Sequence, residues 1–162
     1  DGQSTYTLIP GGNGIEDTDL VLYVSYYSTA SCSGSTLAHA GPCAYDQYGR
    51  PVAGNINVCS NFFSGNNLVD DWKGDVQTML HEMTHITIMV SNLWDDFKDP
   101  TTGDTLDFYD DVYQYDPNIK TPVIKSPKVK QLAQDHFGCT TNILKGMPLT
   151  NYSSHWHMKW LN

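Results

Sequence analysis

The sequence predicts an α+β fold from three observations. Residues 19–27 and 52–58 are short runs rich in β-branched and aromatic residues, which is typical of strands. Residues 70–86 place apolar side chains at spacings of three and four, which predicts an amphipathic helix. The chain has 162 residues, 40% of them hydrophobic, so we expect one globular domain over residues 1–162 with its own core and without internal repeats.

The first predicted strand, residues 19–27, follows the turn-forming residues 11–14 and is almost continuously apolar. Strands that are covered on both faces have this pattern, so we expect it in the interior of a sheet. Residues 28–51 are rich in Gly, Ser and Cys and are expected to be connecting chain. The second strand then follows at residues 52–58.

The predicted helix begins at Asp70 or Asp71, either of which can cap it, and extends to Ile86. At 3.6 residues per turn, Thr78, His81 and His85 share one face. Most of the packing is expected from apolar residues on the adjacent face, namely Val76, Met79, Leu80 and Met83.

Residues 94–116 are rich in aspartate and contain Pro100 and Gly103. We expect an exposed acidic excursion with one short hairpin near residues 105–109, because the spacing lacks the oxygen-ligand pattern of an EF-hand. A second, short helix is predicted over residues 126–137, with Pro127 in its first turn and Gly138 at its end.

Charge and hydropathy exclude several classes of protein. The formal charge is −9, so the chain lacks the basic surface that nucleic-acid binding requires. No apolar run approaches the roughly 20 residues of a membrane span. The chain does not begin with a signal peptide, so we expect it to be mature or excised material.

Cysteine usage indicates an oxidising compartment. The cysteines are Cys32, Cys43, Cys59 and Cys139, and none has Cys-x-x-Cys spacing. This arrangement favours disulfides over a cysteine zinc site, although small buried thiols are the alternative.

The sequence His81-Glu82-Met83-Thr84-His85 is the motif that carries chemistry. Two histidines four apart on a helix can bind one zinc ion, and the glutamate between them can act as a general base. A catalytic zinc usually takes a third protein ligand, for which spacing leaves His39, His136, His155 and His157 as candidates. The alternative is a plain amphipathic helix whose histidines make ordinary hydrogen bonds.

Several further segments, in order along the chain, resemble the leishmanolysin family of surface zinc endopeptidases, which belongs to the metzincins. The segments that carry the resemblance are residues 17–24, 32–40, 50–59, 136–139, 146–149 and 154–156. The resemblance covers nearly the whole chain and implies a metzincin-like catalytic domain. In such a domain a mixed, twisted sheet packs on the active-site helix, and a long loop-rich insertion precedes the third zinc ligand.

The resemblance implies that His155, in the Ser-His-Trp landmark, joins His81 and His85 as a zinc ligand, with Glu82 as the catalytic base. It also implies that Cys139 pairs with a cysteine beyond the chain. Only two of the three remaining cysteines can then pair with each other.

The chain departs from the family pattern in two places. Metzincins usually have glycine three residues after the second histidine, where this chain has Ile88, so either the helix continues or the turn is built differently. The methionine turn and the C-terminal region of the family would lie beyond Asn162, and Met147 and Met158 come too early to supply that turn. Residues 1–162 would then be the N-terminal part of the peptidase.

The expected function is zinc-dependent hydrolysis of peptide bonds in extracellular or surface proteins, with Zn²⁺ as cofactor and Glu82 activating water. The expected partners are protein or peptide substrates, together with the remaining C-terminal part of the same precursor or other extracellular proteins. Gly54 and Asn55 are candidates for the substrate edge, or else plain scaffold. The alternative function is an inactive extracellular structural or adhesion module that keeps the fold.

Overall fold

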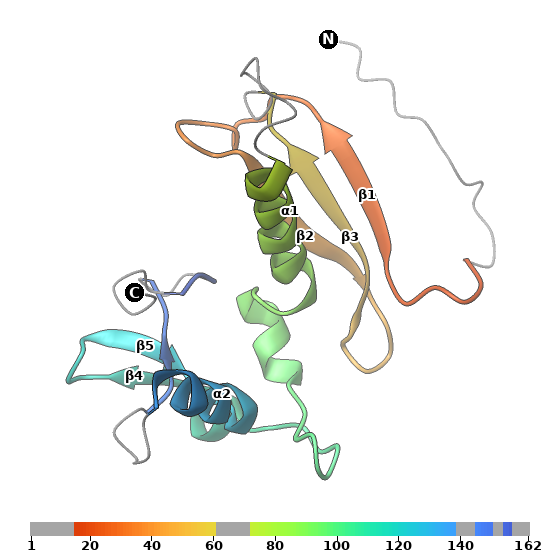
Figure 1. Ribbon diagram of the computed structural model, residues 1–162. Helices are drawn as coiled ribbons and strands as arrows, with labels where there is room; N and C mark the ends of the chain where they lie inside the picture. Colours follow the sequence, from red (N-terminus) through yellow and green to blue (C-terminus); the bar gives the residue numbers. More distant parts are fainter. Residues whose placement is uncertain (1–14, 61–71, 139–144, 151–153, 157–162) are drawn as a thin grey trace.

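The computed structural model describes residues 15–60, 72–138, 145–150 and 154–156. Within them the chain is a mixture of α and β structure (Figure 1). It contains two sheets of three strands each and two α-helices. The α+β class is therefore confirmed. No helix in these described ranges is both long and apolar enough to cross a bilayer.

The first sheet has the strand order β1-β3-β2. Strand β1 (Val21–Tyr26) runs parallel to β3 (Pro51–Val58), and β2 (Ala38–Tyr45) runs antiparallel to it. Helix α1 (Trp72–Thr87) packs on β2 and β3. The core between them contains three buried side chains, Ile56, Val58 and Ile86.

Two expectations about this sheet were wrong. Strand β1 is an edge strand, with Tyr23 62% and Val24 67% exposed, because an apolar run does not reveal which strand the helix covers. Residues 28–51 are also more than connecting chain, since they contain β2. Pro42 obscured β2 in the sequence; proline is tolerated there because β2 is an edge strand and its register shifts between Pro42 and Ala44.

Helix α1 matches its predicted range, although Asp70 and Asp71 lie outside the described residues. Its packing differs from the expectation. Val76 and Leu80 are exposed, whereas Met79, Met83 and Ile86 face the sheet, because the helix lies over only β2 and β3.

The second sheet is antiparallel, in the order β4-β5-β6. Its strands are β4 (Tyr113–Asp116), β5 (Thr121–Ile124) and β6 (Met147–Pro148). Helix α2 (Pro127–Phe137) contacts β6 and ends at Gly138, which has a φ of 64°, so the second helix and its glycine cap are confirmed.

The expectation of an exposed excursion at residues 94–116 was wrong. A 3-10 helix, Ser91–Asp96, and a π-helix, Phe108–Val112, bury Trp94 and Val112 in a second core with Met89, Ile124 and Leu149. The hairpin turns at residues 99–104, earlier than expected, and is closed by a bridge between Lys98 and Thr105. Most of the aspartates are exposed, so the acidic composition hid the apolar residues that alternate with them.

Candidate metal centre

Three imidazole rings meet between the two cores. His81 and His85 come from α1, and His155 comes from the segment that follows β6. The Nε2 atom of His85 lies 3.1 Å from Nε2 of His81 and 3.1 Å from Nε2 of His155. The ligand atoms of all three lie within 4.8 Å of one another, although 70 residues separate His85 from His155.

This spacing fits a metal ion. Zinc–nitrogen bonds of about 2.1 Å in a tetrahedral site place neighbouring nitrogens about 3.4 Å apart, close to the 3.1 Å that separates Nε2 of His85 from Nε2 of each other ring. Three imidazoles suit zinc and leave a fourth position for another group. His81 and His155 are exposed and His85 is half-buried, so the cluster is accessible from solvent.

The carbonyl of Met89 orients the ring of His85. Its oxygen lies 2.9 Å from Nδ1 of His85. Because a carbonyl can only accept a hydrogen bond, Nδ1 carries the proton and Nε2 keeps its lone pair for a metal. This is the tautomer that a ligand through Nε2 requires.

The end of α1 explains how the chain turns without a glycine. The helix ends at Thr87, and the N–H groups of Ile88 and Met89 both donate to the carbonyl of Thr84, at 2.9 and 2.6 Å. Ile88 is not among the described residues with positive φ, so it avoids the left-handed region that β-branched side chains disfavour. Of the two possibilities left open by Ile88, the structure adopts the differently built turn.

His155 is positioned by the second core. Leu149, which is fully buried, pairs with Trp156 in an isolated β-bridge. The N–H of Thr150 donates to the carbonyl of His155 at 2.8 Å, and the hydroxyl of Thr150 donates to the carbonyl of Trp156 at 3.0 Å. Partial burial, followed by the proximity of His85 and His81, lowers the pKa of His155, which favours the neutral ring that a metal ligand needs.

Glu82 lies beside the three rings and is 6% exposed. Its Oε2 is buried without a hydrogen-bond partner among the described residues. Burial of an unpaired carboxylate oxygen is unfavourable, so this atom indicates that a water molecule or ligand belongs next to it. Glu82 and the three histidines line one groove of about 530 Å³.

The opposite wall of this groove is the start of β2, with Leu37, Ala38, His39 and Ala40. The sequence did not predict this wall, because the segment was assigned to connecting chain. The signal that could have indicated the wall was the small residues on both sides of His39. Strand β3 lies in the centre of the sheet, so Gly54 and Asn55 are not at an edge. The expectation of a substrate edge there was wrong, and the exposed edge beside the site belongs to β2.

The other candidate histidines that the structure describes are not part of the three-ring cluster, although His39 lines the same groove. Nε2 of His39 contacts the hydroxyl of Thr29 at 3.0 Å. The ring of His136 stacks edge-on against Phe137 on α2, with a centroid distance of 4.8 Å. His157 lies outside the described residues.

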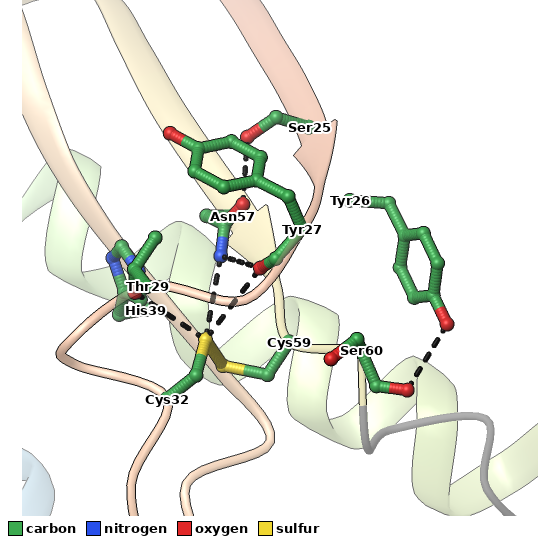
Figure 2. Close-up of a disulfide and its surroundings, with 9 residues drawn as sticks. All are labelled: Ser25, Tyr26, Tyr27, Thr29, Cys32, His39, Asn57, Cys59 and Ser60. Atoms are coloured by element: carbon green, nitrogen blue, oxygen red, sulfur yellow. Dashed lines mark hydrogen bonds between the residues drawn. A yellow bond between two sulfur atoms is a disulfide. The ribbon is translucent and has the colours of Figure 1, made fainter. Parts of the chain in front are cut away.

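A disulfide between Cys32 and Cys59 holds the loop that leads into β2, as Figure 2 shows. The side-chain amide of Asn57 donates to the carbonyl of Tyr27 at 3.0 Å and supports the same loop. Cys43 is an exposed thiol, and Cys139 lies outside the described residues. The preference for a disulfide over a cysteine zinc site is confirmed for this pair.

Comparisons with known proteins identify the same family as the sequence motifs do. The sequence model of the family described as Leishmanolysin matches residues 9–160. The chain is 29% identical to a leishmanolysin-like peptidase of Caenorhabditis elegans over 185 residues, covering 91% of the chain and 27% of that relative. It is 30% identical to a ciliated left-right organizer metallopeptidase of Xenopus laevis over 164 residues, covering 94% of the chain and 22% of the relative. A leishmanolysin-like peptidase of Drosophila melanogaster is 33% identical over 90 residues, covering 54% of the chain and 13% of the relative.

No solved structure matches the chain significantly. The chain thus spans about a quarter of the length of the first two curated relatives.

Proposed function

The chain belongs to the leishmanolysin family of metallopeptidases, and from this premise we propose that it binds one zinc ion through His81, His85 and His155 and hydrolyses peptide bonds. Proteins or peptides are its substrates. The disulfide and the family suit an extracellular or cell-surface setting. Residues 1–162 act as a single metzincin-like portion of the catalytic domain, with the remaining cleft supplied by further sequence of the same precursor.

The three histidines provide neutral nitrogen donors. Nε2 of His85 faces Nε2 of both other rings, and the Met89 carbonyl holds the ring of His85 in the required tautomer. A zinc ion bound there supplies Lewis acidity, which activates water and polarises the scissile carbonyl.

Glu82 moves the proton. Its unpaired Oε2 accepts a proton from the attacking water and returns it to the departing amine. Glu82 and the three rings line the same groove, which keeps the carboxylate close to the reacting atoms. General acid–base help of this kind contributes on the order of 10²–10⁴-fold to the rate.

The buried, unpaired oxygen of Glu82 is the observation that carries the proposal. A structural module that only held zinc would gain no stability from it, because burying a carboxylate oxygen away from hydrogen-bond donors of the described residues is unfavourable. A proton-transfer role explains a glutamate in this position.

The experiment measures zinc content and peptide cleavage separately. We expect one zinc per chain, lost in His155→Ala but kept in His136→Ala, whose ring lies on α2 beside Phe137. Glu82→Gln should keep zinc and lose cleavage by about 10²-fold or more. The unsubstituted chain should cleave peptides, and a metal chelator should inhibit this cleavage.

Two results would contradict the proposal. Unchanged zinc content in His155→Ala would remove the third ligand. Zinc binding without any chelator-sensitive cleavage, in a precursor that includes the remaining cleft, would favour an inactive structural or adhesion module.

A further inference from the structure

A second groove lies along α2, and none of the proposed site residues on α1 lines it. It is lined by α2 and by two side chains from elsewhere, Met147 and Trp156. Its volume of about 240 Å³ is below the range of about 300–1,000 Å³ that small-molecule sites occupy. A groove of this size suits one or two large apolar side chains of another polypeptide.

The groove exposes apolar surface. The residues of α2 that line it recur at helical spacing, and two of them remain open to solvent: Leu132 is 55% exposed and Phe137 is 40% exposed. Val129 and Ala133 on the same face are more deeply buried and form its floor. Helix α2 therefore presents an apolar stripe that its own fold covers only in part.

Two lysines flank the apolar stripe of α2, in a chain that is otherwise acidic. Five of the nine basic residues occur between Lys120 and Lys145, where Asp135 is the only acidic residue, whereas the whole chain has a formal charge of −9. Lys128 and Lys130 directly precede and follow Val129, so at about 100° per residue they flank the apolar stripe on either side. Among the described residues, neither lysine forms an ion pair.

We propose that this groove docks an acidic segment of a protein partner, which inserts a large apolar side chain between Leu132 and Phe137 while its carboxylates face Lys128 and Lys130. Such recognition combines apolar anchoring with charge complementarity. An anionic membrane fits less well, because the apolar surface is a concave groove. Trp156 lines the groove and follows His155 directly, but none of the proposed zinc ligands lines it, so binding can be measured without a peptidase assay.

The probe is a fluorescein-labelled peptide of about 12 residues, which is long enough to bind one groove as a helix. It has Leu and Phe four residues apart, surrounded by glutamates. One comparison peptide has lysine in place of glutamate, and a second has serine in place of Leu and Phe. Binding of each to the full chain is followed by fluorescence anisotropy. Only the acidic apolar peptide should bind, and its affinity should fall severalfold between about 0.05 and 0.5 M salt.

Variants assign the binding to the groove. Leu132→Ser and the pair Lys128→Glu/Lys130→Glu should each raise Kd about tenfold or more. The matched controls are Val24→Ser, an exposed apolar residue on β1, and Lys73→Glu on α1, which should change Kd less than about twofold. Lys128 is exposed and Lys130 is half-buried, and neither belongs to the second core, so the lysine variants remain informative if Leu132→Ser unfolds.

Three outcomes would overturn the proposal. Equal binding of the lysine-containing peptide would remove charge recognition, and equal effects of the control variants would place the contact elsewhere. Binding to phosphatidylserine vesicles but not to the peptide would make the groove a membrane contact. Self-association in sedimentation velocity that disappears in Lys128→Glu/Lys130→Glu would show that a second copy fills it.

Discussion

Gly54 lies where α1 packs closely on the first sheet. Adding a single methyl group there therefore tests how tightly the metal-binding helix packs on the sheet. A Cβ built on Gly54 would lie 2.4 Å from Cγ2 of Ile86 and 2.9 Å from its Cδ1 and Cγ1. Carbon atoms in contact are normally about 3.5–4.0 Å apart, so the Gly54→Ala methyl group overlaps Ile86 by more than about 1 Å. Ile86 is fully buried and follows His85 directly, so the helix itself must move.

The expected loss of stability follows from two opposing effects. Overpacking of this kind costs about 1–3 kcal/mol, whereas replacing glycine restricts the unfolded chain and returns about 0.4–1 kcal/mol. The first effect is larger, so Gly54→Ala should lower the free energy of unfolding by about 1–2 kcal/mol, equivalent to a fall in Tm of about 2–8 °C at this chain length. Zinc affinity should fall as well, because the displaced helix carries two of the three proposed ligands.

The assay is urea unfolding followed by circular dichroism, with Gly41→Ala as the matched control. Gly41 lies in β2 of the same sheet, and an added Cβ there meets no atom within 4 Å. Gly41→Ala should therefore leave stability unchanged or slightly raised. Combining Gly54→Ala with Ile86→Ala should cost less than the sum of the two single changes, because the new methyl group occupies part of the cavity. Equal stabilities of the two glycine variants, or strict additivity of the pair, would refute the close contact.

The remaining predictions concern the disulfide, an acidic turn and a helix end. Cys32 and Cys59 are 27 residues apart, so replacing both by serine should lower stability by about 3–4 kcal/mol through the entropy of the unfolded chain; an unchanged urea midpoint would contradict this. Hydrogen bonds from the N–H groups of Arg50 and Tyr48 lower the pKa of Asp46 below its ordinary 3.8. This depressed pKa adds stability above pH 3.8, and the contribution disappears as the pH falls through the folded-state value. Asp46→Ala should accordingly destabilise the chain at neutral pH and differ little from the parent in strong acid, and an NMR titration of Asp46 at or above 3.8 would argue against it. Gly138 has a φ of 64° with open space around its Cβ position, so Gly138→Ala should cost about 1 kcal/mol from backbone strain alone; no change in Tm would be incompatible with a left-handed cap.

Elements with a local signal were predictable from the sequence. Strand β3, helix α1 and helix α2 have the expected type and nearly the expected bounds, because side-chain periodicity and capping residues act within one element. The environments of other elements were not predictable. Strand β1 lies at an edge, β2 contains a proline, and residues 94–116 supply core residues, because each outcome depends on which distant element packs against the segment.

The sequence by itself determined that His81 and His85 lie on one face of a helix with Glu82 between them, since one helical turn fixes that arrangement. It also carried the family resemblance that singles out His155. Only the tertiary structure decided that the ring of His155 reaches the other two, that the Met89 carbonyl orients His85, and that Oε2 of Glu82 is buried without a hydrogen-bond partner among the described residues. Contacts across 70 residues depend on how the second core sits beside α1, and that placement is set by the packing of many side chains together.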